Sequence, residues 1–544
     1  MNALLVASAL ALALPPMHSD HARPPQLGRV NFQTSCKPTA EKVFERGLAW
    51  LHSFEYEEAE RAFTQAAAAD PGCGIAHWGV AMSNYHPLWG PPTPAEQEKG
   101  TTALARARAA GAVGKRERQY IAALETFYGD SNRVDHKTRA LAYESAMEQL
   151  HRGYPEDQEA AVFYALSLVA AGLLDDDPNY ERETKSAAIL NAVLARVPDH
   201  PGVAHYLIHS FDYPSLAHLA VPAARRYASI APASAHAQHM PSHIFTRLGL
   251  WDEAIQSNKA AEAAARSYAS SRGMPGSWDE RLHAMDYLVY AYLQTGRDRE
   301  AALILDELNQ IERVDPPNFK VAYAATAIPA RLLLERREWR EAAALTLPPK
   351  VQGLVPWAKF RWAQAHIYFA RGVGAARSGN LKLAREQLGK LREIEQALTV
   401  PPGEYDWRKQ VTIQRQIADA WMAFAAGRPD QSLIIMRSAA ALDDATEKHP
   451  VTPGAILPAR EQLGELLLEI GRPAEALKEF ETALQRAPQR LAALSGAARA
   501  AKLAGNTGQA SRYYAALMRV TKNGNGTRPE IRDARSYLAN ARKK

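Results

Sequence analysis

The chain has 544 residues, too many for one ordinary hydrophobic core, so it contains several domains or one extended array of repeats. Its 65 Lys and Arg residues and 59 Asp and Glu residues leave a net charge of +6, which is small for this length. Basic residues are mixed with acidic ones and form no dense run, so we expect no nucleic-acid partner. Alanine is abundant and glycines fall between stretches of helix formers, which favours helix over sheet.

The first residues are typical of an export signal. Residues 4–14 form an unbroken run of apolar and small side chains, which Pro15 and Pro16 follow. This run is shorter than the about 20 apolar residues that a membrane span needs, but it fits the core of a secretory signal. No Lys or Arg precedes it, and the alternative is an apolar N-terminus on a cytosolic protein. We expect a signal peptide over residues 1–22 and no membrane span in the mature chain.

Two segments, residues 40–71 and 457–488, share one spacing of small and large side chains. Small residues at repeat positions 8, 20 and 27 allow two helices to approach closely, large residues fill the space between them, and a proline at position 32 ends the second helix. The six positions hold Gly47, Trp50, Ala59, Phe63, Ala66 and Pro71 in the first copy, and Gly464, Leu467, Ala476, Phe480, Ala483 and Pro488 in the second.

This pattern resembles the tetratricopeptide-repeat (TPR) superfamily over residues 39–520, with weaker copies that begin at Pro201, Ala235 and Leu282. We therefore predict an all-α fold: a solenoid of antiparallel helix pairs in a right-handed superhelix. The predicted parts are an extended segment (23–38), N-terminal repeats (39–200, with a proline-rich loop at 86–94), middle repeats (201–315), C-terminal repeats (316–520) and a tail (521–544).

The two cysteines, Cys36 and Cys73, lie on either side of the first repeat. In an exported chain they are expected to form a disulfide, which would tie the N-terminal segment to the end of that repeat. The alternative is two small buried thiols.

Histidines gather in the middle repeats. Positions 2, 5, 9, 12 and 13 of the first helix of a TPR face the concave groove, because they step by three or four residues. In the three copies that begin at Pro201, Ala235 and Leu282, these positions hold six of the 17 histidines and two aspartates. They are His205, His209, Asp212, His236, His239, His243, His283 and Asp286.

Such a cluster points to metal chemistry. Imidazoles buried on one face are costly unless they are paired, hydrogen-bonded or coordinated. Neutral imidazole is the commonest metal ligand, and histidines four residues apart can share an ion, while carboxylates ligate or orient the rings. We predict a divalent transition metal, copper, zinc or iron, in one site or two adjacent ones. An open position on such a metal would make the protein a metal-dependent hydrolase or oxidoreductase.

Two alternatives stay open. The groove could bind an acidic peptide or a protein partner without metal, with histidines as hydrogen-bond donors, which would make the protein a non-enzymatic scaffold. The histidines could also be scattered if the first helices are wrongly phased. Pro241 lies between His239 and His243, so we expect it to kink or end the helix there.

Three aromatic residues, Trp78, Tyr85 and Tyr290, also fall on groove positions and are candidates for contact with a small-molecule or peptide ligand, although such a stripe is more often core. Segments 77–82, 236–244 and 283–288 resemble a family of exported bacterial TPR proteins. That resemblance supports the fold and a periplasmic or secreted location, and it implies no activity.

Overall fold

The computed structural model describes residues 25–110, 114–175, 177–401 and 404–541. Within these ranges nearly all of the regular secondary structure is helix, as predicted. The signal peptide expected over residues 1–22 lies outside the described residues.

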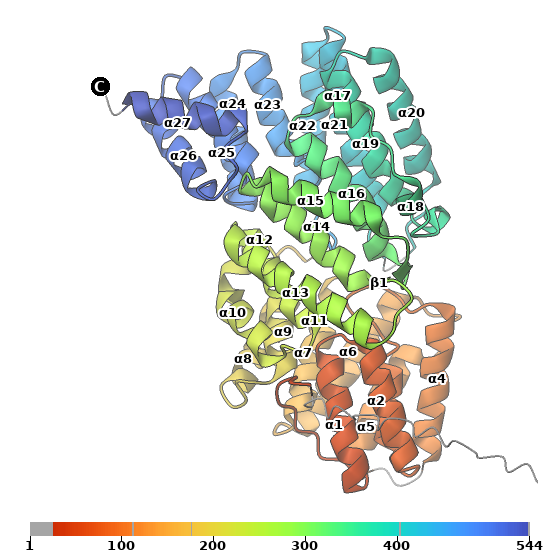
Figure 1. The fold of residues 1–544 in the computed structure, drawn as a ribbon. Coiled ribbons are helices and arrows are strands. Elements are labelled where there is room, and N and C mark those ends of the chain that lie inside the picture. Colours follow the sequence, from red (N-terminus) through yellow and green to blue (C-terminus); the bar gives the residue numbers. More distant parts are fainter. Residues whose placement is uncertain (1–24, 111–113, 176, 402–403, 542–544) are drawn as a thin grey trace, which may run out of the picture.

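Four helix pairs form the lower part of the molecule in Figure 1. Their helices are α1 (Pro38–His52), α2 (Tyr56–Ala69), α3 (Gly74–Met82), α4 (Pro94–Ala109), α5 (Lys115–Tyr128), α6 (His136–Gly153), α7 (Gln158–Gly172) and α8 (Glu181–Leu194). The proline-rich segment 86–94 lies in the connection between α3 and α4, except for Pro94, which begins α4, so proline excludes helix before that residue as expected.

The middle repeats follow the predicted frame. Their elements are α9 (Pro201–Ser210), the 3-10 helix η1 (Ala217–Ala220), α10 (Val221–Ile230), α11 (Ala235–His239), α12 (Pro241–Leu248), α13 (Trp251–Ser271), α14 (Asp279–Gln294) and α15 (Asp298–Gln310). Pro241 starts α12 and separates it from α11, because proline lacks the N–H that a continuous helix would need. Two short parallel strands, β1 (Ser277–Trp278) and β2 (Val314–Asp315), pair across the α14–α15 hairpin.

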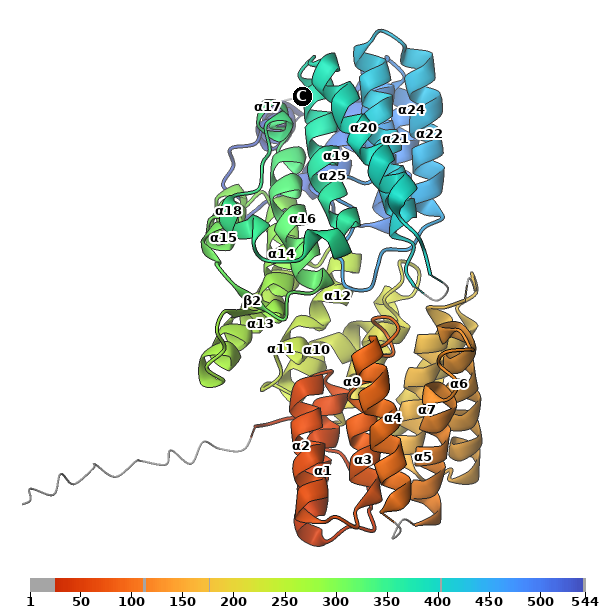
Figure 2. The same ribbon diagram turned by 90° about the vertical axis from the view of Figure 1, so that its right-hand side faces the viewer.

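The C-terminal half continues the stack. Its elements are α16 (Phe319–Glu335), α17 (Trp339–Ala343), α18 (Pro349–Gln352), η2 (Trp357–Lys359), α19 (Arg361–Arg377), α20 (Leu381–Ala397), α21 (Trp407–Ala425), α22 (Pro429–Asp444), α23 (Ala459–Glu469), α24 (Pro473–Arg486), α25 (Leu491–Leu503), α26 (Thr507–Val520) and α27 (Pro529–Ala541). The last helix belongs to the segment expected as a tail, and it packs on α26. Figure 2 shows the first helices and α19–α22 at opposite ends of the molecule, with α9–α14 between them.

The predicted spacing of small and large residues is the packing that holds neighbouring pairs together. The Phe63 ring lies against both Gly47 of its own pair and Gly79 of the next, and a Cβ on Gly47 would be 2.9 Å from that ring. Phe480 repeats this arrangement against Gly464, where a Cβ would lie 2.7 Å from the ring. These contacts make the fold a TPR-type helical-hairpin solenoid.

The C-terminal repeats fold back onto the middle ones. The side chain of Arg490 is fully buried, and its guanidinium binds Glu335 at 2.6 Å and the hydroxyl of Tyr290 at 2.7 Å. Nearby, the indole N–H of Trp251 donates to the carbonyl of Gln489 at 2.9 Å. These contacts join α14 and α13 to the start of α25 and fix how the two halves meet.

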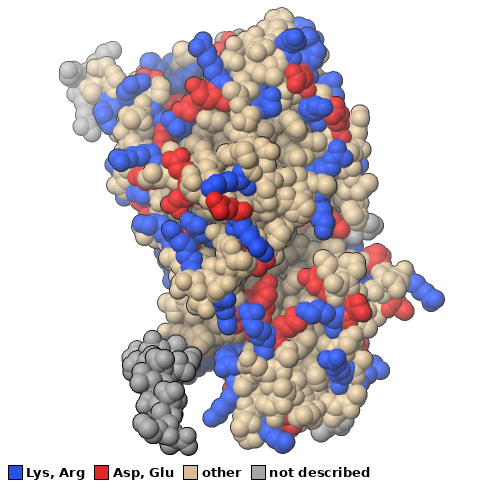
Figure 3. Space-filling view, turned by 45° about the vertical axis from the view of Figure 1, so that its right-hand side comes forward, with Lys and Arg blue, Asp and Glu red and all other residues tan. Residues whose placement is uncertain are grey.

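Neither the surface in view nor the described helices have the features of a specialised environment such as a membrane. Figure 3 shows Lys and Arg interspersed with Asp and Glu on the face in view. Among the helices of the described ranges, we find none with the length and hydropathy of a membrane span.

Replacement of Gly79 by alanine is expected to destabilise the protein by about 1–3 kcal/mol, because the new methyl group would overlap the buried Phe63 ring. Gly389→Ala is the matched control, since Gly389 lies within α20 and no atom approaches the position of its Cβ within 4 Å. There we expect no loss, or a gain of up to about 1 kcal/mol from helix propensity. Urea titrations followed by circular dichroism measure both, and equal effects would contradict this account of the packing.

Candidate metal centre

All six predicted groove histidines meet at the middle of the molecule. Each is at most 8% exposed. They come from four helices: His205 and His209 from α9, His236 and His239 from α11, His243 from α12 and His283 from α14. They form two groups of three, in each of which one nitrogen per ring lies within 4.8 Å of the others.

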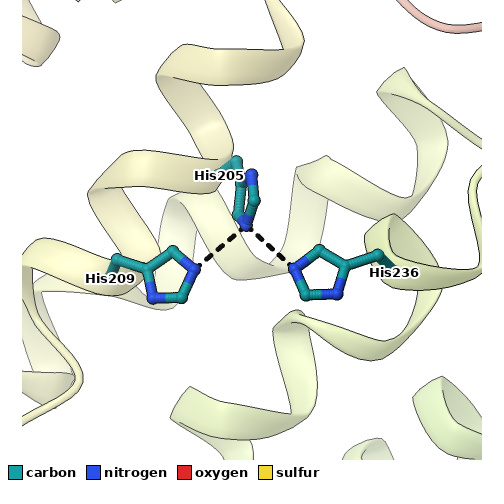
Figure 4. Close-up of side chains that lie close together, drawn as sticks. All are labelled: His205, His209 and His236. Atoms are coloured by element: carbon teal, nitrogen blue, oxygen red, sulfur yellow. Dashed lines mark hydrogen bonds between the residues drawn. The ribbon is translucent and has the colours of Figure 1, made fainter. Parts of the chain in front are cut away.

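The first triad contains His205, His209 and His236. Figure 4 shows the ring of His205 between the other two. Its Nε2 lies 3.1 Å from Nε2 of His209 and 3.2 Å from Nε2 of His236. Two nitrogens bound to one tetrahedral zinc ion at about 2.0–2.1 Å each would lie at a similar separation. The triad therefore fits a single metal ion.

The orientation of His205 is set by the backbone. Its Nδ1 lies 2.7 Å from the carbonyl oxygen of His52. A carbonyl only accepts, so Nδ1 carries the proton and Nε2 presents a lone pair to the triad. This is the arrangement that metal-bound histidines use, with the second ring nitrogen donating to a fixed acceptor.

The second triad contains His239, His243 and His283. The Nε2 atoms of His239 and His243 are 3.0 Å apart, and the ring of His283 lies with its centre 4.1 Å from that of His239. The break at Pro241 does not separate the ligands, since His239 ends α11 and His243 lies in the first turn of α12.

Hydrogen bonds outside this triad fix both ring tautomers. His243 Nδ1 donates to the carboxylate of Asp212 at 3.0 Å, and His239 Nδ1 donates to Oδ1 of Asn258 at 2.7 Å. The amide of Asn258 is itself oriented, because its Nδ2 donates to the carbonyl of Ala254 at 2.8 Å. Both Nε2 atoms therefore present lone pairs to each other. The hydroxyl of Tyr287, 3.4 Å from Nε2 of His243, can donate to one of these lone pairs, and a cation between the two nitrogens would satisfy both.

A proton is a poor candidate for that cation. Burial lowers the pKa of His243 to about 4 and that of His239 well below its usual range. Burial also lowers the pKa of His205, His209 and His283 well below the usual value. Neutral imidazoles are the form that binds metal, so the burial that disfavours protons leaves the ligands ready for a metal ion.

The two predicted aspartates have different surroundings. Asp212 accepts from His243, from Arg247 at 2.9 Å and from Lys448 at 3.0 Å, so it orients a ring and is neutralised by cations. Asp286 lies against the guanidinium of Arg331 at 2.5 Å. The structure does not bring Asp286 into either triad, because the buried Arg331 takes its carboxylate.

The triads are neighbours under a shared cover. The ring centres of His209 and His243 are 6.2 Å apart, and those of His236 and His239 are 6.3 Å apart. A small cavity lies between them, lined also by Glu280 and Lys320. Its remaining walls come from two loops and α11–α12, through Trp89, Met240, Pro450 and Val451. These loops are segment 86–94 and the connection between α22 and α23, residues 445–458, so both cover the concave face here.

A larger cavity reaches the same site from the side. It has a volume of about 700 Å³, and His209 and Asp212 form part of its wall. Aromatic residues and charges of both signs line the rest, among them Tyr213, Tyr405 and Arg247. This volume lies within the about 300–1,000 Å³ typical of small-molecule sites.

A third buried group, which was not predicted from the sequence, lies beside the first triad. His52 and His200 hold the carboxylate of Glu159 at 2.7 and 3.0 Å, and Tyr206 hydrogen-bonds the other nitrogen of His52. Burial raises the pKa of Glu159, but contact with the two histidines outweighs this effect and lowers the pKa below its usual value. Its polar groups are satisfied, so this group supports the backbone that orients His205. His52 occupies repeat position 13 of the first copy, a groove position that could have revealed it.

The three aromatic candidates lie elsewhere. Trp78 is fully buried beside Phe32, Tyr85 is buried against Phe127, and Tyr290 is held by Arg490. None of the three lines either cavity next to the histidines, which fits the core alternative for this stripe.

The remaining predicted pair lies far from the histidines in the N-terminal segment. Cys36 and Cys73 are joined by a disulfide with their Cα atoms 4.8 Å apart. The bond ties the extended segment to the N-terminus of α3, the helix that follows the first repeat.

Comparison with known proteins adds no function. No protein-family model matches the chain, and no curated protein sequence is similar to it. Among solved structures, a human IFIT1 dimer with m7Gppp-AAAA is 13% identical, covering 90% of this chain and 98% of that one with a TM-score of 0.37. The Cut9–Hcn1 hetero-tetramer of APC/C is 11% identical, covering 92% and 76% with a TM-score of 0.34. The TPR domain of P58(IPK) is 16% identical, covering 71% and 100% with a TM-score of 0.21. Likeness at this level carries no argument about what the chain binds.

Proposed function

We propose that the protein binds two transition-metal ions, one in each histidine triad. The observation that carries this proposal is the pair of Nε2 lone pairs of His239 and His243, which face each other at 3.0 Å with both tautomers fixed from outside. The first triad supports it with the same pattern, since His205 also directs a lone pair at its two neighbours. Ligation by three imidazoles suits copper, zinc or iron.

The cavity beside the first triad supports an enzyme that acts on a small molecule. It opens to the site at His209, and its volume of about 700 Å³ suits a small organic substrate. A metal with three protein ligands keeps a position for water or substrate, which gives hydrolysis with zinc and allows oxygen chemistry with copper or iron. We therefore infer a metal-dependent hydrolase or oxidoreductase.

The scaffold alternative is less well supported at this part of the groove. A peptide that lies along a TPR groove needs an open concave face. Here the chain covers the histidines with its own loops, through Trp89 on one side and through Pro450 and Val451 on the other. Lys448, in the second of these loops, is anchored to Asp212 at 3.0 Å.

Export to the periplasm or the cell exterior remains part of the proposal. The apolar run near the N-terminus favours it, and the disulfide between Cys36 and Cys73 is a bond that persists in oxidising compartments. Expression with the N-terminal residues intact, followed by fractionation and N-terminal sequencing, tests it directly.

Protein purified without a His tag is expected to contain about two metal equivalents per chain by elemental analysis. Replacement of His205 and His236 by asparagine should leave about one equivalent, held by the second triad, and replacement of His239 and His243 should leave the other. His218→Asn is the matched control, because His218 is exposed on η1 and belongs to neither triad. A metal content well below one equivalent in the wild type after reconstitution with zinc, copper and iron would refute the proposal.

Asn258→Leu is expected to weaken metal binding at the second triad by about 10–100-fold while the first triad keeps its ion. The leucine has a similar volume but no acceptor for the Nδ1 proton of His239, so the ring is free to turn its lone pair away. Competition with a chromophoric chelator measures the two affinities separately. An unchanged pair of affinities would show that the amide does not orient the ring.

The ion of the second triad is expected to stay bound down to about pH 5 and to be lost as the pH approaches 4. A proton displaces the metal only below the pKa of the ligand, and burial lowers that of His243 to about 4. Exposed imidazoles, with a pKa of about 6.5, would release metal near pH 6. Gel filtration at each pH followed by elemental analysis measures bound metal as a function of pH. Release centred near pH 6 would contradict the claim that burial of the histidines sets the pH of release.

A further inference from the structure

Glu280 lines the small cavity between the two triads, and one of its carboxylate oxygens has no hydrogen-bond partner. Glu280 is 6% exposed, and its Oε1 binds the ammonium of Lys320 at 2.5 Å. Its Oε2 is buried and has no donor within hydrogen-bond distance; Nδ1 of His236, which also lacks a hydrogen-bond partner, lies 3.9 Å away. A buried carboxylate oxygen without a donor is costly, so this atom points to a missing hydrogen-bond donor.

The space beside this oxygen has the size of one small ligand. The cavity measures about 10 Å³, close to the room that a single water molecule needs. His209 and His236 of the first triad and His243 and His283 of the second form its walls together with Glu280. A molecule in it would lie against histidines of both triads and against Glu280.

We propose that this cavity binds one solvent-derived ligand, water or hydroxide, between the two metal ions, and that Oε2 of Glu280 accepts its hydrogen bond. This inference rests on the proposed function, since the metal ions would hold the oxygen of the ligand. Glu280 then acts as a selectivity residue: its carboxylate favours small ligands that carry an O–H and disfavours anions of the same size that cannot donate.

The neighbouring carboxylate provides a matched control. Asp279 binds the same ammonium of Lys320 at 2.5 Å and is equally buried, but it does not line the cavity. Asp279→Asn and Glu280→Gln therefore remove the same charge from the same lysine, and only Glu280→Gln changes the group that faces the ligand.

Fluoride is the probe, because it has the size and charge of hydroxide and no hydrogen to donate. Full-length protein loaded with two equivalents of cobalt(II) is titrated with fluoride, and binding is followed by the visible absorption of the metal. Glu280→Gln is expected to bind fluoride at least about tenfold more tightly than the wild type, because an amide N–H replaces a carboxylate oxygen. Asp279→Asn is expected to match the wild type within about threefold.

The outcomes separate the two proposals. Absence of two bound cobalt ions in the wild type refutes the metal centre itself. With two ions present, equal fluoride affinities in Glu280→Gln and Asp279→Asn overturn the role of Glu280, and so does loss of one ion from Glu280→Gln alone, which would make Glu280 a metal ligand. If Glu280→Gln does not fold, Glu280→Asp withdraws the oxygen by one methylene and should still tighten fluoride binding, whereas unchanged binding contradicts the inference.

Discussion

The centre depends on hydrogen bonds that the histidines make away from the site. Six imidazoles enter a region where water cannot satisfy them, which costs free energy unless each ring finds a partner. The carbonyl of His52, the carboxylate of Asp212 and the amide oxygen of Asn258 each accept one hydrogen bond from a histidine Nδ1. In each case the lone pair of Nε2 is directed inward. In the proposed centre this arrangement would favour a metal ion over a proton, because burial keeps the rings neutral.

The groups that orient the histidines come from elements far apart along the chain. The site therefore forms only when the N-terminal, middle and C-terminal repeats are packed together. His52 ends α1, whereas His205 lies in α9. Lys448 reaches back from the loop after α22 to neutralise Asp212. Arg490 fixes the return of the C-terminal repeats by ion pairs to α16 and α23 through Glu335 and Glu461. Opening the contact between the halves would separate ligands from the groups that orient them.

The sequence could predict the proposed histidine ligands because they follow a local spacing rule along each helix. Steps of three and four residues place His205 and His209 on one face whatever the rest of the chain does, and the same rule holds across the break at Pro241. Asp286 satisfies that rule too, but Arg331, 45 residues later, takes its carboxylate. Glu280 precedes the repeat frame that begins at Leu282, and only the packing of α14 on α16 brings it to Lys320 and the cavity. Long-range pairing of this kind leaves no periodic signal.

One position of the repeat pattern carries a polar residue beside the histidines in place of an aromatic one. Position 24 of the clearest repeats is a phenylalanine, Phe63 or Phe480, whose ring fills the space between helix pairs. In the repeat that begins at Ala235 this position is Asn258, which is fully buried and accepts a hydrogen bond from Nδ1 of His239. An amide in place of an aromatic ring gives up apolar burial in the core, and its hydrogen bond offsets that loss only while His239 is held in one tautomer. At that packing position the repeat departs from its pattern and places an amide that orients His239.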